Sequence, residues 1–244
     1  MSNVSPVNVH RVGNIAVLTL DDGKVNALNA STLPALVNSL PSLTSADAVV
    51  FTGRPGMFCP GFDLKALPKM APAERQEVVR LFSDFTMGLY LFPRPVVVAL
   101  SGHALAGGAV FSLTGDSRLM AAGPYQFGFT EVAVGVALPG FVVELGQAAM
   151  SPASAVDLLL HARRLSPDEA ARQGLVEVVE APVLLDPAVA RATELAKLPA
   201  AAYQLTKERL RGALAARWRE TAAADVERLA TLLGAASMGP GRTP

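Results

Sequence analysis

The sequence predicts an α/β fold with a mostly helical C-terminal portion, and three observations lead to this prediction. Strand-like and helix-like segments alternate through the first half of the chain, a pattern that is typical of parallel strand pairing. After about residue 140, Ala, Leu, Arg and Glu recur at helical spacing. No low-complexity linker divides the 244 residues, of which 51% are hydrophobic, so the chain can bury one large core.

The N-terminal segments predict a β-hairpin. Residues 7–11 and 14–20 have strand character, and Gly13-Asn14 between them is a good hairpin turn signal. The remaining elements are expected where apolar runs or helical periodicity lie between Gly and Pro residues. We expect strands at residues 48–51, 96–100, 118–121, 126–129 and 176–180, and helices at residues 31–40, 72–90, 107–113, 152–160, 167–173, 186–197, 200–215 and 217–235.

The overall charge and the cysteine content exclude several classes of protein. Lys plus Arg and Asp plus Glu both number 21, so we expect no general attraction to nucleic acid or to anionic membranes. The single cysteine, Cys59, permits no intrachain disulfide, which fits a reducing compartment. The N-terminus lacks a basic segment followed by an apolar one, and apolar stretches are interrupted before roughly 18 residues. We therefore expect a cytoplasmic protein without a signal peptide, a transmembrane helix, or a nucleic-acid or membrane partner.

Two glycine-rich segments follow strands that we expect to be buried. Residues 51–64 contain three glycines and two prolines, and could present backbone N–H groups to a ligand or form an ordinary surface loop. Residues 101–111 join a strand to a helix N-terminus, where free N–H groups and the helix dipole favour a phosphate or a developing oxyanion. Their spacing matches neither G-x-G-x-x-G nor a phosphate loop ending in Gly-Lys-Ser/Thr, so both nucleotide interpretations are disfavoured.

Five short motifs occur in order along the chain. They are residues 23–29 (GKVNALN), 58–63 (FCPGFD), 102–109 (GHALAGGA), 127–135 (FGFTEVAVG) and 164–176 (RLSPDEAARQGLV). In this order they resemble the N-A-L loop, the two glycine motifs, the F-x-x-x-E-x-x-x-G segment and the A-x-x-x-G-L-V segment of the crotonase (enoyl-CoA hydratase/isomerase) superfamily. The resemblance runs from about residue 10 to residue 215.

The resemblance implies a fold, an assembly and a substrate class. The fold would be the crotonase (ClpP-like) spiral of ββα units with a helical C-terminal portion. Residues 1–195 would form the spiral core with an acyl-CoA site, and residues 196–244 a helical trimerisation region. The protein would be a homotrimer or a dimer of trimers. Its substrate would be an acyl-CoA thioester, with no metal and no further cofactor, because coenzyme A is part of the substrate.

The same resemblance places two oxyanion-binding N–H groups on Phe62 and Gly107. Removing a proton next to a thioester carbonyl forms an enolate, and two fixed donors stabilise its oxygen more in the transition state than in the ground state. Main-chain groups supply both donors, so the side chain of Phe62 is left to shape the acyl pocket. Asp63 is expected to brace its own turn.

The acid/base residues indicate which chemistry follows enolate formation. Hydratases of the family generally use two glutamates, and the corresponding positions here are Val110 and Glu131. One glutamate in an apolar pocket is typical of the isomerases, which take a proton from one carbon and return it two carbons away. Alternatively, Glu131 begins a helical turn after Thr130 and has no catalytic role.

Three functions therefore remain open. A Δ3-Δ2-enoyl-CoA isomerase that uses Glu131 is favoured. An enoyl-CoA hydratase or another crotonase-type lyase is the second, and it gains support if Glu144 lines the pocket as a second carboxylate. The third is an acyl-CoA-binding protein without turnover, which the replacement of a glutamate by Val110 keeps possible. His103, in the second glycine motif, is expected to pack behind the site.

By the same resemblance, coenzyme A would be bound by the N-A-L loop, the first glycine motif and a C-terminal lysine. The matching basic residues are Lys24, Lys65 and Lys207, and for each of them a solvated surface lysine is the alternative. The full set of expected substrate-binding residues is Lys24, Val25, Ala27, Pro60, Gly61, Asp63, Leu64, Lys65, Gly108, Val110 and Lys207.

Overall fold

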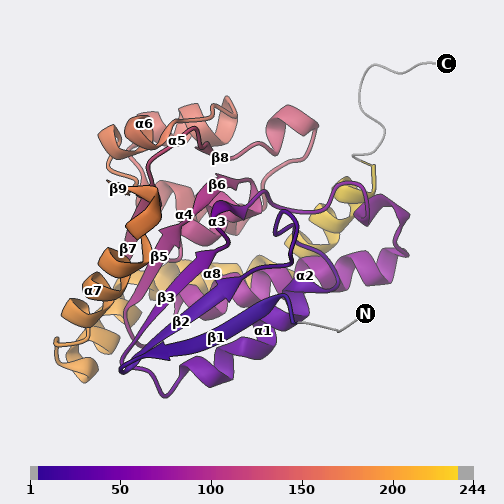
Figure 1. The fold of residues 1–244 in the computed structure, drawn as a ribbon. Helices are drawn as coiled ribbons and strands as arrows, with labels where there is room; N and C mark the ends of the chain where they lie inside the picture. The colour runs from indigo at the N-terminus through magenta and orange to yellow at the C-terminus, as the bar shows by residue number, and fades with distance from the viewer. Residues whose placement is uncertain (1–4, 236–244) are drawn as a thin grey trace.

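The computed structural model describes residues 5–235, and Figure 1 shows strands and helices alternating before the chain turns helical. Four ββα units follow one another in this part of the chain. They are β1 (Val7–Val12), β2 (Ile15–Leu20) and α1 (Thr32–Leu43); β3 (Ala48–Gly53), β4 (Gly56–Cys59) and α2 (Pro72–Tyr90); β5 (Val96–Leu100), β6 (Gly102–Leu105) and α3 (Gly107–Ser112); and β7 (Ser117–Ala121), β8 (Phe127–Gly128) and α4 (Gly140–Ala149).

The later elements are mostly helical. They are α5 (Pro152–Ala155) with the π-helical η3 (Val156–Leu160), α6 (Pro167–Arg172), β9 (Glu177–Val179), α7 (Leu185–Leu195) and α8 (Ala200–Ala235). Single 3-10 turns lie at η1 (Leu67–Lys69), η2 (Val132–Val134) and η4 (Ala181–Val183). No helix within residues 5–235 is long and apolar enough to cross a membrane.

The strands form two sheets. The larger has the order β1-β2-β3-β5-β7-β9, in which β1 and β2 are antiparallel and every other pair is parallel. The smaller has the order β4-β6-β8 and is parallel. Each unit after the first thus contributes one strand to each sheet, so the chain winds as a spiral of repeated units.

Period-2 alternation along the central strands supplies two cores. In β3, Val49 and Phe51 point into the larger core, whereas Ala48 and Val50 point to the opposite face. Helix α7 covers that opposite face, where it contacts β2, β3 and β5. Because both faces are covered, these strands are apolar throughout, as is typical of parallel sheets.

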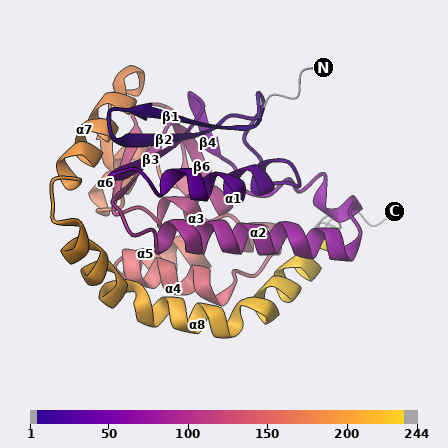
Figure 2. The ribbon, with the colours of Figure 1, turned by 90° about the horizontal axis from the view of Figure 1, so that it is seen from below.

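Helix α8 packs along the side of the molecule that carries α2 and α4, and Figure 2 shows it curving beside α2. Trp218 anchors it: its ring stacks on Phe141 of α4 at a centroid distance of 4.1 Å, and its Nε1–H donates to Ser83 Oγ of α2 at 2.8 Å. The C-terminal helix is therefore part of the core around the candidate site.

The predicted fold class is confirmed: α/β, with ββα units followed by helices. One helix prediction was wrong, because residues 200–215 and 217–235 form the single helix α8. No proline interrupts residues 200–235, so nothing in the sequence forces a break there. The division at residue 195 into a core and a trimerisation region stays a prediction, and residues 236–244 of that region lie outside the described residues.

Besides the short 3-10 turns, three elements were missed. We expected no strand at β4 or β6 because both lie in the glycine-rich segments. We also expected no helix at residues 140–149, where α4 begins directly after Pro139. These three elements border the candidate site.

Candidate functional site

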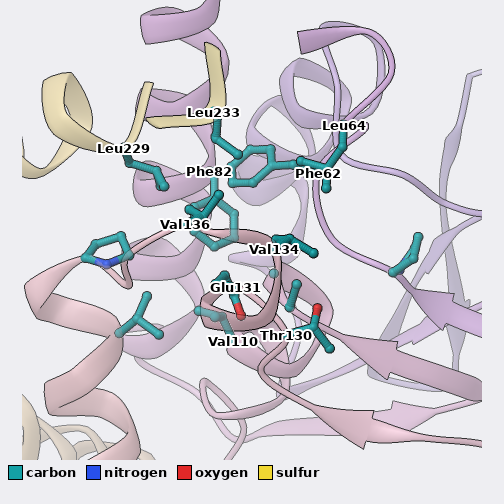
Figure 3. A pocket seen from close by; sticks show the side chains of 15 residues that line it. Phe62, Leu64, Phe82, Val110, Thr130, Glu131, Val134, Val136, Leu229 and Leu233 are labelled. Atoms are coloured by element: carbon teal, nitrogen blue, oxygen red, sulfur yellow. The ribbon is translucent and has the colours of Figure 1, made fainter. Parts of the chain in front are cut away.

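A cavity lies where the two glycine-rich loops meet α4 and the end of α8. Figure 3 shows side chains from these elements converging on Glu131. The lining residues are Pro60, Phe62, Leu64, Phe82, Ala106, Gly107, Val110, Thr130, Glu131, Val134, Val136, Pro139, Val142, Leu229 and Leu233.

The first glycine-rich loop is held by an isolated parallel bridge between Leu28 and Phe62. The Leu28 N–H donates to the Gly61 carbonyl at 2.9 Å, and the Asp63 N–H donates to the Leu28 carbonyl at 3.0 Å. Gly61 has a φ of +91°, a conformation that side chains rarely adopt. The ring of Phe62 packs edge-on against Phe82 with a centroid distance of 5.0 Å, and so forms one wall of the cavity.

The second loop turns sharply into α3. Ala106 has a φ of +48°, and its carbonyl accepts the Val110 N–H at 3.0 Å in the first helical bond. Gly107 is the first residue of α3, so its own N–H has no partner within the helix. A Cβ on Gly108 would lie 2.1 Å from the Cys59 carbonyl oxygen, so only glycine permits this approach of the two loops.

The two predicted oxyanion donors are neighbours. A Cβ on Gly61 would lie only 3.0 Å from the Gly107 nitrogen. Among the described residues, neither the Phe62 N–H nor the Gly107 N–H donates to a protein acceptor. In both cases the carbonyl of the same peptide group is hydrogen-bonded, which fixes the direction of the N–H. The arrangement can therefore bind one oxygen atom through two pre-oriented donors.

Glu131 is the ionisable residue among those that line the cavity. It follows β8 and immediately precedes η2. Its Oε2 atom is buried and has no hydrogen-bond partner. Burial raises the pKa of this carboxyl to about 7, although hydrogen bonds from the backbone N–H groups of Glu131 and Thr130 partly oppose the shift. Such a group can accept and return a proton near neutral pH.

The side chains that line the cavity with Glu131 are apolar except for Thr130. Val110 lines the cavity and is only 1% exposed. Glu144 does not line it, because its carboxylate pairs with Arg217 at 2.9 Å on α8. The condition under which Glu144 would support a hydratase is therefore not met within the described residues. His103 also lies outside the lining: its Nδ1 accepts the Gln126 N–H and its ring packs against Tyr125.

Of the other predicted residues, some line the cavity or support its loop, and others are exposed on the two loops beside it. Pro60 and Leu64 line the cavity, and the Asp63 carboxylate braces its turn by accepting the N–H groups of Lys65 and Ala66. The bridge between Leu28 and Phe62 brings the N-A-L loop beside the first glycine-rich loop. On these two loops the side chains of Lys24, Val25, Leu64 and Lys65 are exposed, and Ala27 is half-buried.

Lys207 is not brought to the cavity. Its ammonium is buried and contacts Asp116 at 2.6 Å and the carbonyl of Arg94 at 3.1 Å. Arg211 pairs with the other oxygen of Asp116 at 2.8 Å, so both cations fasten α8 to the starts of β5 and β7. Burial lowers the pKa of Lys207 to about 8 against the opposing effect of Asp116. Within this chain Lys207 therefore has a structural role, and its contact with coenzyme A stays a prediction.

Eight apolar lining residues were not anticipated. Phe82 comes from α2, Ala106 from the turn before α3, and Leu229 and Leu233 from the last turns of α8. The other four lie between the end of η2 and the first turn of α4: Val134, Val136, Pro139 and Val142. Helical periodicity marks such residues as buried but does not identify what they face. Only the tertiary packing of α8 onto α2 and α4 places them in this cavity.

Comparisons with known proteins agree with this geometry. A family model described as enoyl-CoA hydratase/isomerase matches residues 10–242. The chain is 33% identical over 210 residues to a putative enoyl-CoA hydratase of Thermus thermophilus, covering 81% of each. It is 29% identical over 225 residues to the human mitochondrial enoyl-CoA delta isomerase 1, covering 90% of this chain and 74% of the human one.

A solved structure extends the likeness to the fold. The crystal structure of human mitochondrial delta3-delta2-enoyl-CoA isomerase matches with a TM-score of 0.90 at 28% identity, covering 96% of this chain and 93% of the human one. The relatives thus carry the names of both reactions, and similarity does not separate them.

Proposed function

The chain belongs to the enoyl-CoA hydratase/isomerase family, and we propose that it is a Δ3-Δ2-enoyl-CoA isomerase that uses Glu131 as its proton shuttle. The observation that carries the proposal is that Glu131 bears the single carboxyl among the side chains that line the cavity, beside two backbone N–H groups that have no acceptor within residues 5–235. The family supplies the acyl-CoA class of substrate. The choice of isomerisation as the reaction rests on the residues around Glu131.

In the proposed mechanism the thioester oxygen accepts the N–H groups of Phe62 and Gly107. Ionised Glu131 removes a proton from C2, and the electron pair of that C–H bond forms the enolate. The two donors stabilise the negative oxygen, each by about 3–4 kcal/mol in the transition state. The enolate then takes the same proton back at C4, so the double bond moves from C3–C4 to C2–C3 and Glu131 regains its charge.

Hydration is disfavoured by what surrounds the carboxyl. Adding water requires a water molecule that is held by two or more polar partners and polarised. The side chain at the position of the second hydratase glutamate is Val110, and Glu144 is occupied by Arg217. An apolar wall instead suits a shuttle, because it raises the pKa of Glu131 and keeps competing water away.

A pair of substrates distinguishes the functions. Purified protein is given a 3-enoyl-CoA and, separately, a 2-enoyl-CoA, and the conjugated thioester is followed by absorbance. We expect the first to become conjugated and the second to remain unhydrated. Hydration of the 2-enoyl-CoA at a comparable rate would make the protein a hydratase, and tight binding of both without either reaction would make it a binding protein.

The activity should depend on the ionisation of Glu131. Because burial raises its pKa to about 7, the fraction of ionised base falls about tenfold for each pH unit below that value. We expect kcat/KM for the 3-enoyl-CoA to rise with pH and to level off above about pH 7 to 8. Circular dichroism at each pH checks that the fold is retained. A flat profile between about pH 5 and 8 contradicts the assignment of Glu131 as the base.

We also propose that coenzyme A lies across the N-A-L loop and the first glycine-rich loop. The β-bridge between Leu28 and Phe62 joins these two loops. The bridge lies next to the Phe62 N–H, which would hold the thioester oxygen. Lys24 and Lys65 are exposed on these loops and would bind the phosphates of coenzyme A. Because the net charge of the chain is zero, attraction of phosphates has to come from such local positive charges.

We further propose a homotrimer or a dimer of trimers. A cyclic trimer joins two different surface patches of each subunit, and two exposed apolar patches are present. One is a groove beside η3, with Val156 and Leu160 exposed by 47% and 64%. The other is beside the start of α8, where Leu198 and Leu210 line one hollow and are exposed by 49% and 80%.

Charge in either patch should dissociate the assembly. We expect Leu160→Asp and Leu210→Asp each to shift the protein from trimer to monomer in sedimentation velocity, because a charge would be desolvated at the interface. Val12→Asp is the matched control, since Val12 is an apolar residue of β1 that is 44% exposed and lies in neither patch. A wild-type protein that sediments as a monomer contradicts the proposed assembly.

A further inference from the structure

Asn26 is a buried polar residue that the proposed reaction does not use. Its side chain is completely buried, and its φ of +60° is unusual for a residue other than glycine. Its Nδ2 donates to the Leu20 carbonyl at 2.8 Å, to the Met57 carbonyl at 3.0 Å and to the Phe58 carbonyl at 3.2 Å. Asn26 therefore ties the end of β2 and its own loop to β4, the strand that leads into the first glycine-rich loop.

The turn around Asn26 is closed by a second set of bonds. The Asp22 carboxylate accepts the N–H of Asn26 at 2.9 Å and the N–H of Lys24 at 2.8 Å. The Asp22 N–H donates in return to Asn26 Oδ1 at 3.0 Å. The side chain of Asn26 thus uses its oxygen to hold the turn and its nitrogen to hold β4.

Two residues further along, Leu28 holds the peptide group that carries one oxyanion donor. Its N–H donates to the Gly61 carbonyl, and that carbonyl shares a peptide plane with the Phe62 N–H. In a trans peptide the C=O and the N–H point in opposite directions, so this bond turns the Phe62 N–H away from Leu28. A hydrogen bond accepted by the carbonyl also polarises the peptide and strengthens its N–H as a donor.

We propose that Asn26 is a positioning residue for the oxyanion hole, acting through Leu28 to orient the Gly61–Phe62 peptide. Rigid attachment of residues 22–28 to β4 fixes where the Leu28 N–H lies, and this fixes the plane of the donor peptide. The inference rests on the proposed role of the Phe62 N–H. It adds a reason why a polar side chain is buried between the loop expected to bind coenzyme A and the loop that holds the thioester oxygen.

Asn26→Gly tests this proposal, because glycine adopts the positive φ without strain while the three donated bonds are lost. We expect kcat for the 3-enoyl-CoA to fall about 10- to 100-fold with KM changed less than about threefold, since a small misplacement of a catalytic group has effects of this size. The C=O stretching frequency of bound 2-enoyl-CoA should also move back toward its value in solution. A residue that only stabilised the fold would leave that frequency unchanged in the folded variant.

Ser39→Ala is the matched control. Ser39 is also a buried polar residue, but its hydroxyl donates to the Leu36 carbonyl within α1 and it belongs to neither loop of the site. We expect this variant to keep its kcat and its carbonyl frequency. If Asn26→Gly does not fold, Asp22→Ala loosens the same turn from a half-buried position and should show a smaller loss in the same direction.

The outcomes separate this proposal from the proposed function. Unchanged kcat and carbonyl frequency in folded Asn26→Gly, or equal losses in Ser39→Ala, overturn the role of Asn26. A wild-type carbonyl frequency equal to that in solution overturns it as well. If the wild-type protein shifts the carbonyl, loses that shift in Asn26→Gly and yet isomerises nothing, the isomerase proposal fails and the role of Asn26 stands.

Discussion

Replacing Glu131 with Gln is expected to lower kcat for the 3-enoyl-CoA by about 10³-fold or more, because general acid/base catalysis contributes up to about 10⁴-fold. The amide keeps the shape of the side chain but can neither accept the C2 proton nor return it. Affinity for acyl-CoA, measured by calorimetry, should change less than about threefold, since the N–H groups of Phe62 and Gly107 are untouched. Turnover that persists in Glu131→Gln shows that another group is the base.

The same variant should be more stable than the wild type at alkaline pH. The folded-state pKa of Glu131 is raised to about 7, so the stability that its protonated form contributes is complete below about pH 4.5 and is lost as pH rises through about 7. The difference between this pKa and the ordinary value of 4.5 corresponds to at most about 3 kcal/mol of unfolding free energy above pH 7. Urea unfolding at about pH 5 and 8 measures it. A variant less stable than wild type at pH 8 contradicts the burial of this carboxylate.

Gly61→Ala is expected to lower kcat by at least about 10²-fold, which is the cost of losing one oxyanion donor. The new methyl group would lie 2.7 Å from the Ala106 Cβ and 3.0 Å from the Gly107 nitrogen, so the two loops must separate. The φ of +91° adds backbone strain. Steady-state kinetics should show the loss in kcat, and thermal unfolding should show a lower Tm.

Gly174→Ala separates strain from the clash. Gly174 also has a positive φ, of +72°, but a Cβ there would meet nothing within 4 Å. We expect a destabilisation of about 1–2 kcal/mol with kcat unchanged. If Gly61→Ala loses no more activity than this control, the contact between the two loops does not form the oxyanion hole.

The elements that could be predicted from sequence are those whose pattern is local. The hairpin of β1 and β2 has its turn signal at Gly13-Asn14, and β3 and β5 are short apolar runs. Strands β4 and β6 were not predicted because a glycine-rich composition is typical of loops. A Cβ on Gly102 would lie 2.0 Å from the Gly56 backbone, so the glycines there permit close pairing of the two strands.

The candidate site divides in the same way. Phe62, Gly107 and Glu131 were identified through motifs, and the structure gathers them around one cavity. Leu229 and Leu233 were missed because only the packing of α8 decides what they face. The pairing of Lys207 with Asp116 was also missed, because a sequence does not reveal that two residues 91 positions apart will meet.

The proton itself gives the most direct test of a single-carboxylate shuttle in a water-excluding cavity. A 3-enoyl-CoA that carries deuterium at both C2 positions is converted in ordinary water, and the 2-enoyl-CoA product is analysed by NMR during early turnover. The account predicts that a substantial share of the product carries deuterium at C4, delivered there by Glu131. Solvent hydrogen at C4 in every product molecule from the first turnover would contradict it.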